Sequence, residues 1–160
     1  MKYFLCIAAV TLALFFSSPA QAAVPDGTII SASVMQPLAR WVENASRMKI
    51  HSLPIVTASG FRLKTSLGLQ GVQQARSVAA YLPGQIIINN IMWDPESPRA
   101  KSYLVHEMVH HAQTLAGKTY PCHDAKERDA YILQNRWLVE HGEDPLYSQS
   151  WIDEVSACRS

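Results

Sequence analysis

The residues best suited to chemistry lie in one short run, Ser102–Gln113, which has the sequence S-Y-L-V-H-E-M-V-H-H-A-Q. Within it, His106 to His110 fits the pattern H-E-x-x-H. Residues four apart on an α-helix lie about 40° apart around the axis and one turn along it. Both imidazoles can therefore bind one Zn²⁺ ion. Glu107 lies next to that face, where it can accept a proton from water that the metal activates.

A catalytic zinc site needs a third protein ligand and one open position. The pattern H-E-x-x-H-x-x-G-x-x-H does not supply it, because Gln113 and Ala116 stand where glycine and histidine would be needed. We expect Glu127, in the first turns of the next helix, to be the third ligand. Two neighbours, His123 and Asp124, are alternatives. Glu127 could also cap its own helix, with Asp124 as the N-cap residue.

The helix that carries Glu127 has a stripe of residues at helical spacing: Glu127, Ala130, Tyr131 and Gln134. We expect this stripe to face the H-E-x-x-H helix, because Ala130 permits a close approach.

Other polar residues near the motif are weaker candidates. His111 points about 100° away from His110, and we expect it to be a partly exposed helix residue. The side chains of Tyr131, Tyr147 and His141 could each stabilise a tetrahedral oxyanion, although a structural role is the simpler expectation for each.

The pattern of apolar residues and turns predicts an α+β fold in one small domain. Ser97 and Pro98 are typical of a helix start, and Gly117 of a helix end. Pro83-Gly84 fits a type II turn between two strands. The expected helices are residues 35–49, 97–117, 124–141 and 147–157, and the expected strands are weak ones within 54–69 and a short antiparallel hairpin of 77–82 with 85–89.

The N-terminus is typical of a secretory signal peptide. Lys2 precedes the apolar run Tyr3–Phe16, and small residues at Ala20 and Ala22 fit an A-x-A cleavage site. We expect residues 1–22 to be removed and residues 23–160 to form the mature domain. The apolar run is too short for a bilayer-spanning helix. The sequence therefore predicts an exported protein, either periplasmic or secreted.

Composition narrows the range of partners. Loss of Lys2 leaves as many basic as acidic residues, and no charge run suggests binding to nucleic acid or to a membrane surface. Cys6 leaves with the signal peptide, so Cys122 and Cys158 remain as a pair. In an oxidising compartment such a pair predicts a disulfide.

The run H-E-M-V-H-H-A-Q, followed by E-R-D-A-Y-I-L-Q, resembles the zincin metallopeptidases over roughly residues 85–141. The resemblance is to the gluzincin type, in which two histidines and a glutamate from the next helix hold zinc. It implies His106, His110 and Glu127 as ligands and Glu107 as the general base. Tyr131 stands where this type commonly has an acidic residue. The resemblance also implies a substrate-pairing edge strand, which we expect at Gln85–Asn90.

Two functions follow as expectations. The first is an exported zinc-dependent peptidase that hydrolyses an amide bond in a peptide or protein, including a cell-wall peptide. The alternative is an exported binding domain that zinc stabilises but that catalyses nothing.

Overall fold

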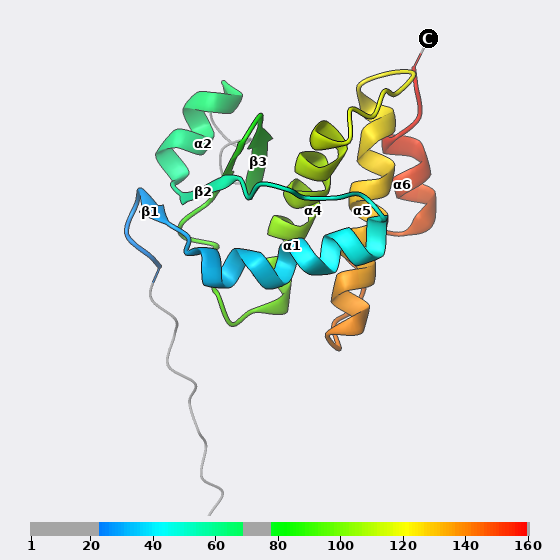
Figure 1. The fold of residues 1–160 in the computed structure, drawn as a ribbon. Helices are drawn as coiled ribbons and strands as arrows, with labels where there is room; N and C mark the ends of the chain where they lie inside the picture. The colour runs from blue at the N-terminus through cyan, green and yellow to red at the C-terminus, as the bar shows by residue number, and fades with distance from the viewer. Residues whose placement is uncertain (1–22, 69–77, 160) are drawn as a thin grey trace, which may run out of the picture.

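The structure of the protein is a computed structural model that describes residues 23–68 and 78–159 (Figure 1). The expected signal peptide, residues 1–22, lies outside the described residues. The elements in chain order are β1 (Thr28–Ile29), α1 (Ala32–Ser46), β2 (Ile55–Ala58), α2 (Gly60–Leu67), β3 (Ala79–Leu82), β4 (Gln85–Ile88), α4 (Pro98–Leu115), the 3-10 helix η1 (Asp124–Lys126), α5 (Glu127–Glu140) and α6 (Gln149–Val155). This content confirms the α+β class: α1 and α2 lie between strands of one small sheet in the chain, and the remaining helices follow it.

The sheet has the strand order β1-β2-β4-β3. The predicted hairpin is confirmed: β3 and β4 pair antiparallel, and Gly84 has the positive φ of 76° that a type II turn requires. The sheet as a whole is mixed, because β2 runs parallel to β4. The predicted antiparallel hairpin is thus extended by a parallel strand, whose direction the sequence did not indicate. Helix α2 and strand β3 lie between the two parallel strands in sequence and supply the long connection that parallel pairing needs.

The edge strand was assigned incorrectly. Residues 85–88 form β4, which lies between β2 and β3, and the strands at the two edges of the sheet are β1 and β3. The physical reason lies in burial. Ile86, Ile87 and Ile88 are each at most 1 % exposed, which is the pattern of a strand covered on both faces. Apolar content alone could not distinguish an edge strand from a central one.

One of the weak strands predicted within 54–69 is confirmed as β2, whereas the other is the helix α2. Ser59 caps this helix by accepting a hydrogen bond from the Arg62 backbone N–H at 3.1 Å. Gly68 ends it in the left-handed conformation, with φ 61°. These caps outweigh the strand-like alternation of the segment.

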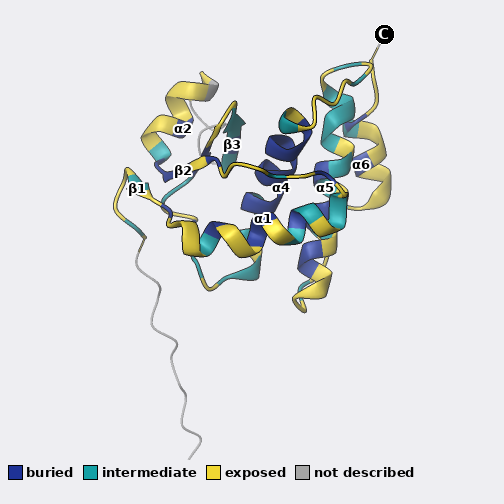
Figure 2. Ribbon diagram, in the orientation of Figure 1, coloured by how far each residue is buried: buried dark blue, intermediate teal, exposed yellow. Residues whose placement is uncertain are grey.

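Helix α4 forms the centre of the protein, packed between the sheet, α1 and α5 (Figure 2). Its start is the predicted one, since the Ser97 side chain accepts a hydrogen bond from the Ala100 N–H. Leu104, Val105 and Met108 on this helix are fully buried. The helix therefore presents its polar residues from a rigid, tightly packed element.

The C-terminal part of the chain holds α5 against α4 (Figure 1). Cys122 and Cys158 form the predicted disulfide, with 5.7 Å between their Cα atoms. It joins the segment before η1 to the end of α6, and so fixes the approach to Glu127. No helix among residues 23–68 and 78–159 has the length and apolar character needed to cross a membrane.

Candidate metal centre

Three side chains from α4 and α5 meet at one point. The Nε2 atoms of His106 and His110 lie 3.2 Å apart. Glu127 Oε2 lies 3.2 Å from the first and 3.1 Å from the second. Ligand atoms around a tetrahedral Zn²⁺ ion, each about 2.0–2.1 Å from it, are separated by roughly 3.3 Å. The triangle therefore has dimensions that fit three ligands of one metal ion.

Glu127 occupies this triangle because it is the first residue of α5, directly after the 3-10 turn of η1. Its carboxylate faces the two histidines, and no side chain caps the start of η1 or α5. The two alternative ligands lie outside the triangle: the side chains of His123 and Asp124 are 79 % and 50 % exposed and lie 3.5 Å from each other, and His123 lines the cavity beside the triangle. Among the residues that the structure describes, His106, His110 and Glu127 form the one cluster able to hold a metal.

A chain of hydrogen bonds orients His106. Ser102 Oγ donates to the carbonyl of Arg99 at 2.7 Å, so it accepts from the Gln134 amide nitrogen at 3.2 Å. The amide oxygen of Gln134 therefore faces His106 Nδ1, at 3.1 Å, and can only accept a proton from it. The chain places a proton on Nδ1 and leaves Nε2 of His106 facing the triangle.

His110 is oriented in the same way from its own helix. The amide nitrogen of Gln113 donates to the carbonyl of Lys126 at 2.9 Å. Its oxygen accordingly accepts from His110 Nδ1, also at 2.9 Å. Both imidazoles thus present Nε2, and both are held by neutral amides. Metal-bound histidines often use a carboxylate or a carbonyl for this contact.

The two glutamines were not identified as site residues from the sequence. Gln113 stands three residues after His110, a spacing that brings two side chains together on a helix, so a local signal existed. Gln134 belonged to the predicted stripe of α5, which does face α4: Ala130 and Gln134 are buried, and the Tyr131 ring lies 4.5 Å from that of His106.

The charges of the cluster shift its titration. Burial would raise the pKa of Glu127, but hydrogen bonds from His106 and His110 and their positive charge hold it well below its usual range. Burial would lower the pKa of His110, yet the hydrogen bond to Glu127 and the charge of Glu107 raise it overall. A cation that binds there therefore competes with protons for these groups.

Glu107 lies beside the triangle at the wall of an open cleft. Burial raises the pKa of its carboxyl group, and the nearby histidines only partly oppose this effect. No group among the described residues forms a hydrogen bond with the Glu107 carboxylate. A cavity of about 400 Å³ in front of it is lined by His106, His110, Glu127 and strand β3. The carboxylate can therefore exchange a proton with a molecule in the cleft.

His111 is buried, which contradicts the expectation of a partly exposed residue. It is 2 % exposed, and its Nε2 donates to the carbonyl of Ser52 at 2.8 Å. Its Nδ1 is then the acceptor for the hydroxyl of Tyr81, at 3.3 Å. His111 thus connects α4 to the edge strand β3 and to the loop before β2.

Two of the three oxyanion candidates lie at the cleft. Tyr131 and Tyr147 line a second cavity of about 170 Å³ that also includes Glu107. His141 instead stacks on Trp137, with 3.8 Å between the ring centroids, and lies past the far end of α5. His141 is therefore not among the residues that line the two cavities beside the triangle.

Comparison with known proteins places the chain in a family. Residues 28–159 match the family described as "Domain of unknown function (DUF6647)", and the chain belongs to it. This description assigns no activity. No curated protein and no solved structure matches the chain.

Proposed function

We propose that the protein is an exported zinc-dependent metallopeptidase that hydrolyses an amide bond in a peptide or protein substrate. The observation that carries this proposal is the triangle of His106 Nε2, His110 Nε2 and Glu127 Oε2, with sides of 3.1–3.2 Å, beside the carboxylate of Glu107. The two histidines and the glutamate would hold Zn²⁺. The resemblance of H-E-M-V-H-H-A-Q and E-R-D-A-Y-I-L-Q to the gluzincin type of zincin agrees with this assignment.

The donor set supports zinc as the metal. Two imidazole nitrogens and one carboxylate oxygen are a common set of protein ligands in catalytic zinc sites. When bound, zinc would polarise the carbonyl of the scissile amide and lower the pKa of a water molecule. The amide contacts of Gln113 and Gln134 keep both Nε2 atoms directed at this point.

Glu107 would be the general base and then the general acid. Its raised pKa makes the carboxylate a stronger base than that of an exposed glutamate. It would take one proton from the attacking water and deliver it to the leaving amine nitrogen. Water is thereby added across the C–N bond, which gives a carboxylic acid and an amine.

Strand β3 would hold the substrate. The Asn89 N–H donates to the Val78 carbonyl, and hydrogen-bonded pairs alternate along an antiparallel ladder. The backbone groups of Ala79 and Tyr81 therefore point to the outer edge, where an extended peptide can pair with them. Ala79 and Tyr81 also line the cavity at Glu107.

Export is part of this proposal. The disulfide between Cys122 and Cys158 is compatible with an oxidising compartment. The N-terminal sequence has the pattern of a signal peptide, which would release the mature domain to the periplasm or the medium. We propose no nucleic-acid partner and no membrane attachment after cleavage.

The test combines metal content with turnover. The full chain is expressed, purified after export and analysed for zinc, and a mixed peptide library is assayed for cleavage by mass spectrometry. We expect about one zinc per chain and specific cleavage. Glu107→Gln should keep the zinc and abolish cleavage, whereas Glu154→Gln, on an exposed face of α6, should change neither.

Two outcomes would contradict the proposal. A wild-type protein that holds zinc but cleaves no peptide would favour the non-catalytic, zinc-stabilised binding domain. A protein that folds normally and binds no zinc would exclude both functions.

A further inference from the structure

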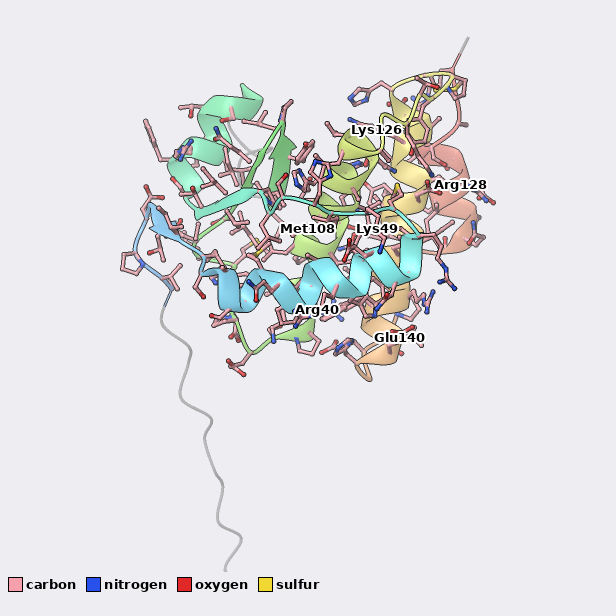
Figure 3. All side chains as sticks on the ribbon, in the orientation of Figure 1. Arg40, Lys49, Met108, Lys126, Arg128 and Glu140 are labelled. Carbon is pink, nitrogen blue, oxygen red and sulfur yellow. A yellow bond between two sulfur atoms is a disulfide. The ribbon has the colours of Figure 1, made fainter. Side chains whose placement is uncertain are left out.

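The cleft in front of the metal triangle continues past His110 into a third cavity, of about 270 Å³. The two spaces share Tyr81, His110 and Lys126, so they form one continuous groove alongside β3. The part beyond His110 is called the basic pocket here, and the side chains that define it are Tyr81, Thr114, Lys118, Tyr120 and Lys126. Figure 3 shows Lys126 beside the ends of α4 and α5 that carry the ligands.

The charge of the basic pocket is positive. Two ammonium groups line it and no carboxylate does, among the described residues. Lys118 lies 3.5 Å from Asp129, and Lys126 lies 4.0 Å from Glu127 Oε1. The side chains of Lys118 and Asp129 are 44 % and 43 % exposed, and such a pair contributes little free energy. The Lys118 ammonium group can therefore turn toward an anion in the pocket at small cost, and the Lys126 ammonium group forms no hydrogen bond with Glu127 that an anion would have to replace.

Tyr120 adds a hydrogen-bond donor. Its hydroxyl is buried and has no hydrogen-bond partner among the described residues. Burial raises the pKa of Tyr120 to about 12, and the negative charge of Asp129 and a weak contact of the hydroxyl with that carboxylate add to this rise. The hydroxyl therefore keeps its proton at neutral pH. A buried donor that lacks an acceptor with good geometry is costly, and a bound acceptor in the pocket would lower that cost.

The opposite end of the groove has a different character. Its cavity of about 170 Å³ is lined by Tyr103, Tyr131 and Tyr147. The rings of Tyr131 and Tyr147 lie 4.8 Å apart, and Trp151 stacks on Tyr147 at 4.5 Å. An apolar or aromatic group fits that end. The two ends of the groove therefore differ in the side chains that line them, with aromatic rings beyond Glu107 and ammonium groups beyond His110.

We propose that the basic pocket binds a carboxylate of the substrate, so that the protein acts on peptides with an acidic group on the His110 side of the metal. This inference rests on the proposed function and names its substrate class. The carboxylate can be the side chain of an aspartate or glutamate or the C-terminus of the peptide. Both present the same two oxygen acceptors to Lys118, Lys126 and Tyr120.

Binding is measured on the Glu107→Gln variant, which cannot turn over the substrate. The probes are blocked tetrapeptides in matched pairs, with glutamate or glutamine at each position, titrated by calorimetry with and without zinc. A third set lacks glutamate but has a free C-terminal carboxylate, which separates the two sources of the anion. We expect at least one glutamate peptide to bind about ten-fold more tightly than the matched glutamine peptide.

Variants of the lysines identify the pocket. Lys118→Ala with Lys126→Ala should abolish the difference in affinity between each acidic peptide and its neutral counterpart. Lys118→Glu should reverse the preference. Lys64→Ala is the matched control, because Lys64 is exposed on α2, which packs on the other face of the sheet through Leu63 and Ala80. The preference should also weaken as salt is raised.

Equal binding of every acidic and neutral pair would overturn the inference. A preference that survives in the double lysine variant would do the same, since it would place the anion elsewhere. Because the assay needs no turnover, a failed acidic preference in a protein that cleaves peptides rejects this inference alone. Absence of cleavage with an intact acidic preference rejects the proposed function alone.

Discussion

The hydrogen bond from His106 to Gln134 gives the sharpest test of how the site is built. Gln134 is 1 % exposed, and its amide contacts His106 Nδ1 at 3.1 Å and Ser102 Oγ at 3.2 Å. Gln134→Leu keeps the approximate shape and removes both contacts. It leaves a buried imidazole N–H without an acceptor, which costs about 1–3 kcal/mol. The ring is then free to rotate its Nε2 away from the triangle.

We expect Gln134→Leu to weaken zinc binding by about 10–100-fold, equivalent to about 1.4–2.8 kcal/mol. Competition with a chromophoric chelator measures this affinity on samples whose circular dichroism confirms that they are folded. Gln134→Glu restores an acceptor for Nδ1 and should bind zinc at least as tightly as the wild type. Gln149→Leu, on the exposed start of α6, should have no effect. Wild-type zinc affinity in folded Gln134→Leu would refute the argument that this amide orients His106.

Three further predictions concern other parts of the molecule. Cys122→Ser removes a disulfide that closes 36 residues, and should lower the free energy of unfolding in urea by roughly 3–4 kcal/mol; a loss below about 1 kcal/mol would contradict this. His111→Leu leaves the Ser52 carbonyl without its donor, and should lower stability by about 1–3 kcal/mol and raise KM more than it lowers kcat, because β3 loosens; unchanged hydrogen exchange in β3 would contradict it. In the metal-free protein, the raised pKa of His110 gives stability that is lost as pH rises through it, and the lowered pKa of Glu127 gives stability that is lost as pH falls through it. The melting temperature with chelator present should therefore be highest between about pH 4.5 and 6.5, and excess zinc should remove the decline above that window; a metal-free maximum above pH 8 would contradict the assignment.

Local spacing was enough to predict that His106 and His110 meet, but not what surrounds them. His106 and His110 lie on one helical face at any helix position, so their meeting follows from the spacing alone. Glu127 needed one assumption about packing, namely that Ala130 faces α4, and the structure bears this out. The orientation of both imidazoles depends on Gln134, whose role appears only once α5 packs against α4.

Features that depend on contacts between distant residues could not be predicted from local sequence patterns. The parallel pairing of β2 with β4 depends on a connection through α2. This segment has a strand-like alternation of residues, so the helix caps at Ser59 and Gly68 were not recognised in the sequence. His111 appeared to be exposed because its partners, Ser52 and Tyr81, lie 59 and 30 residues away in sequence. The basic pocket likewise joins residues from β3, α4 and the loop after α4, which no local pattern connects.

The most direct test of the account is the position of the metal itself. Crystals of the exported protein, grown with zinc, are measured on both sides of the zinc absorption edge. We predict one anomalous peak about 2.0–2.2 Å from His106 Nε2, His110 Nε2 and a Glu127 oxygen, and loss of this peak in Glu127→Ala. A zinc peak at His123 and Asp124, or no peak at the triangle in a folded protein, would contradict the account.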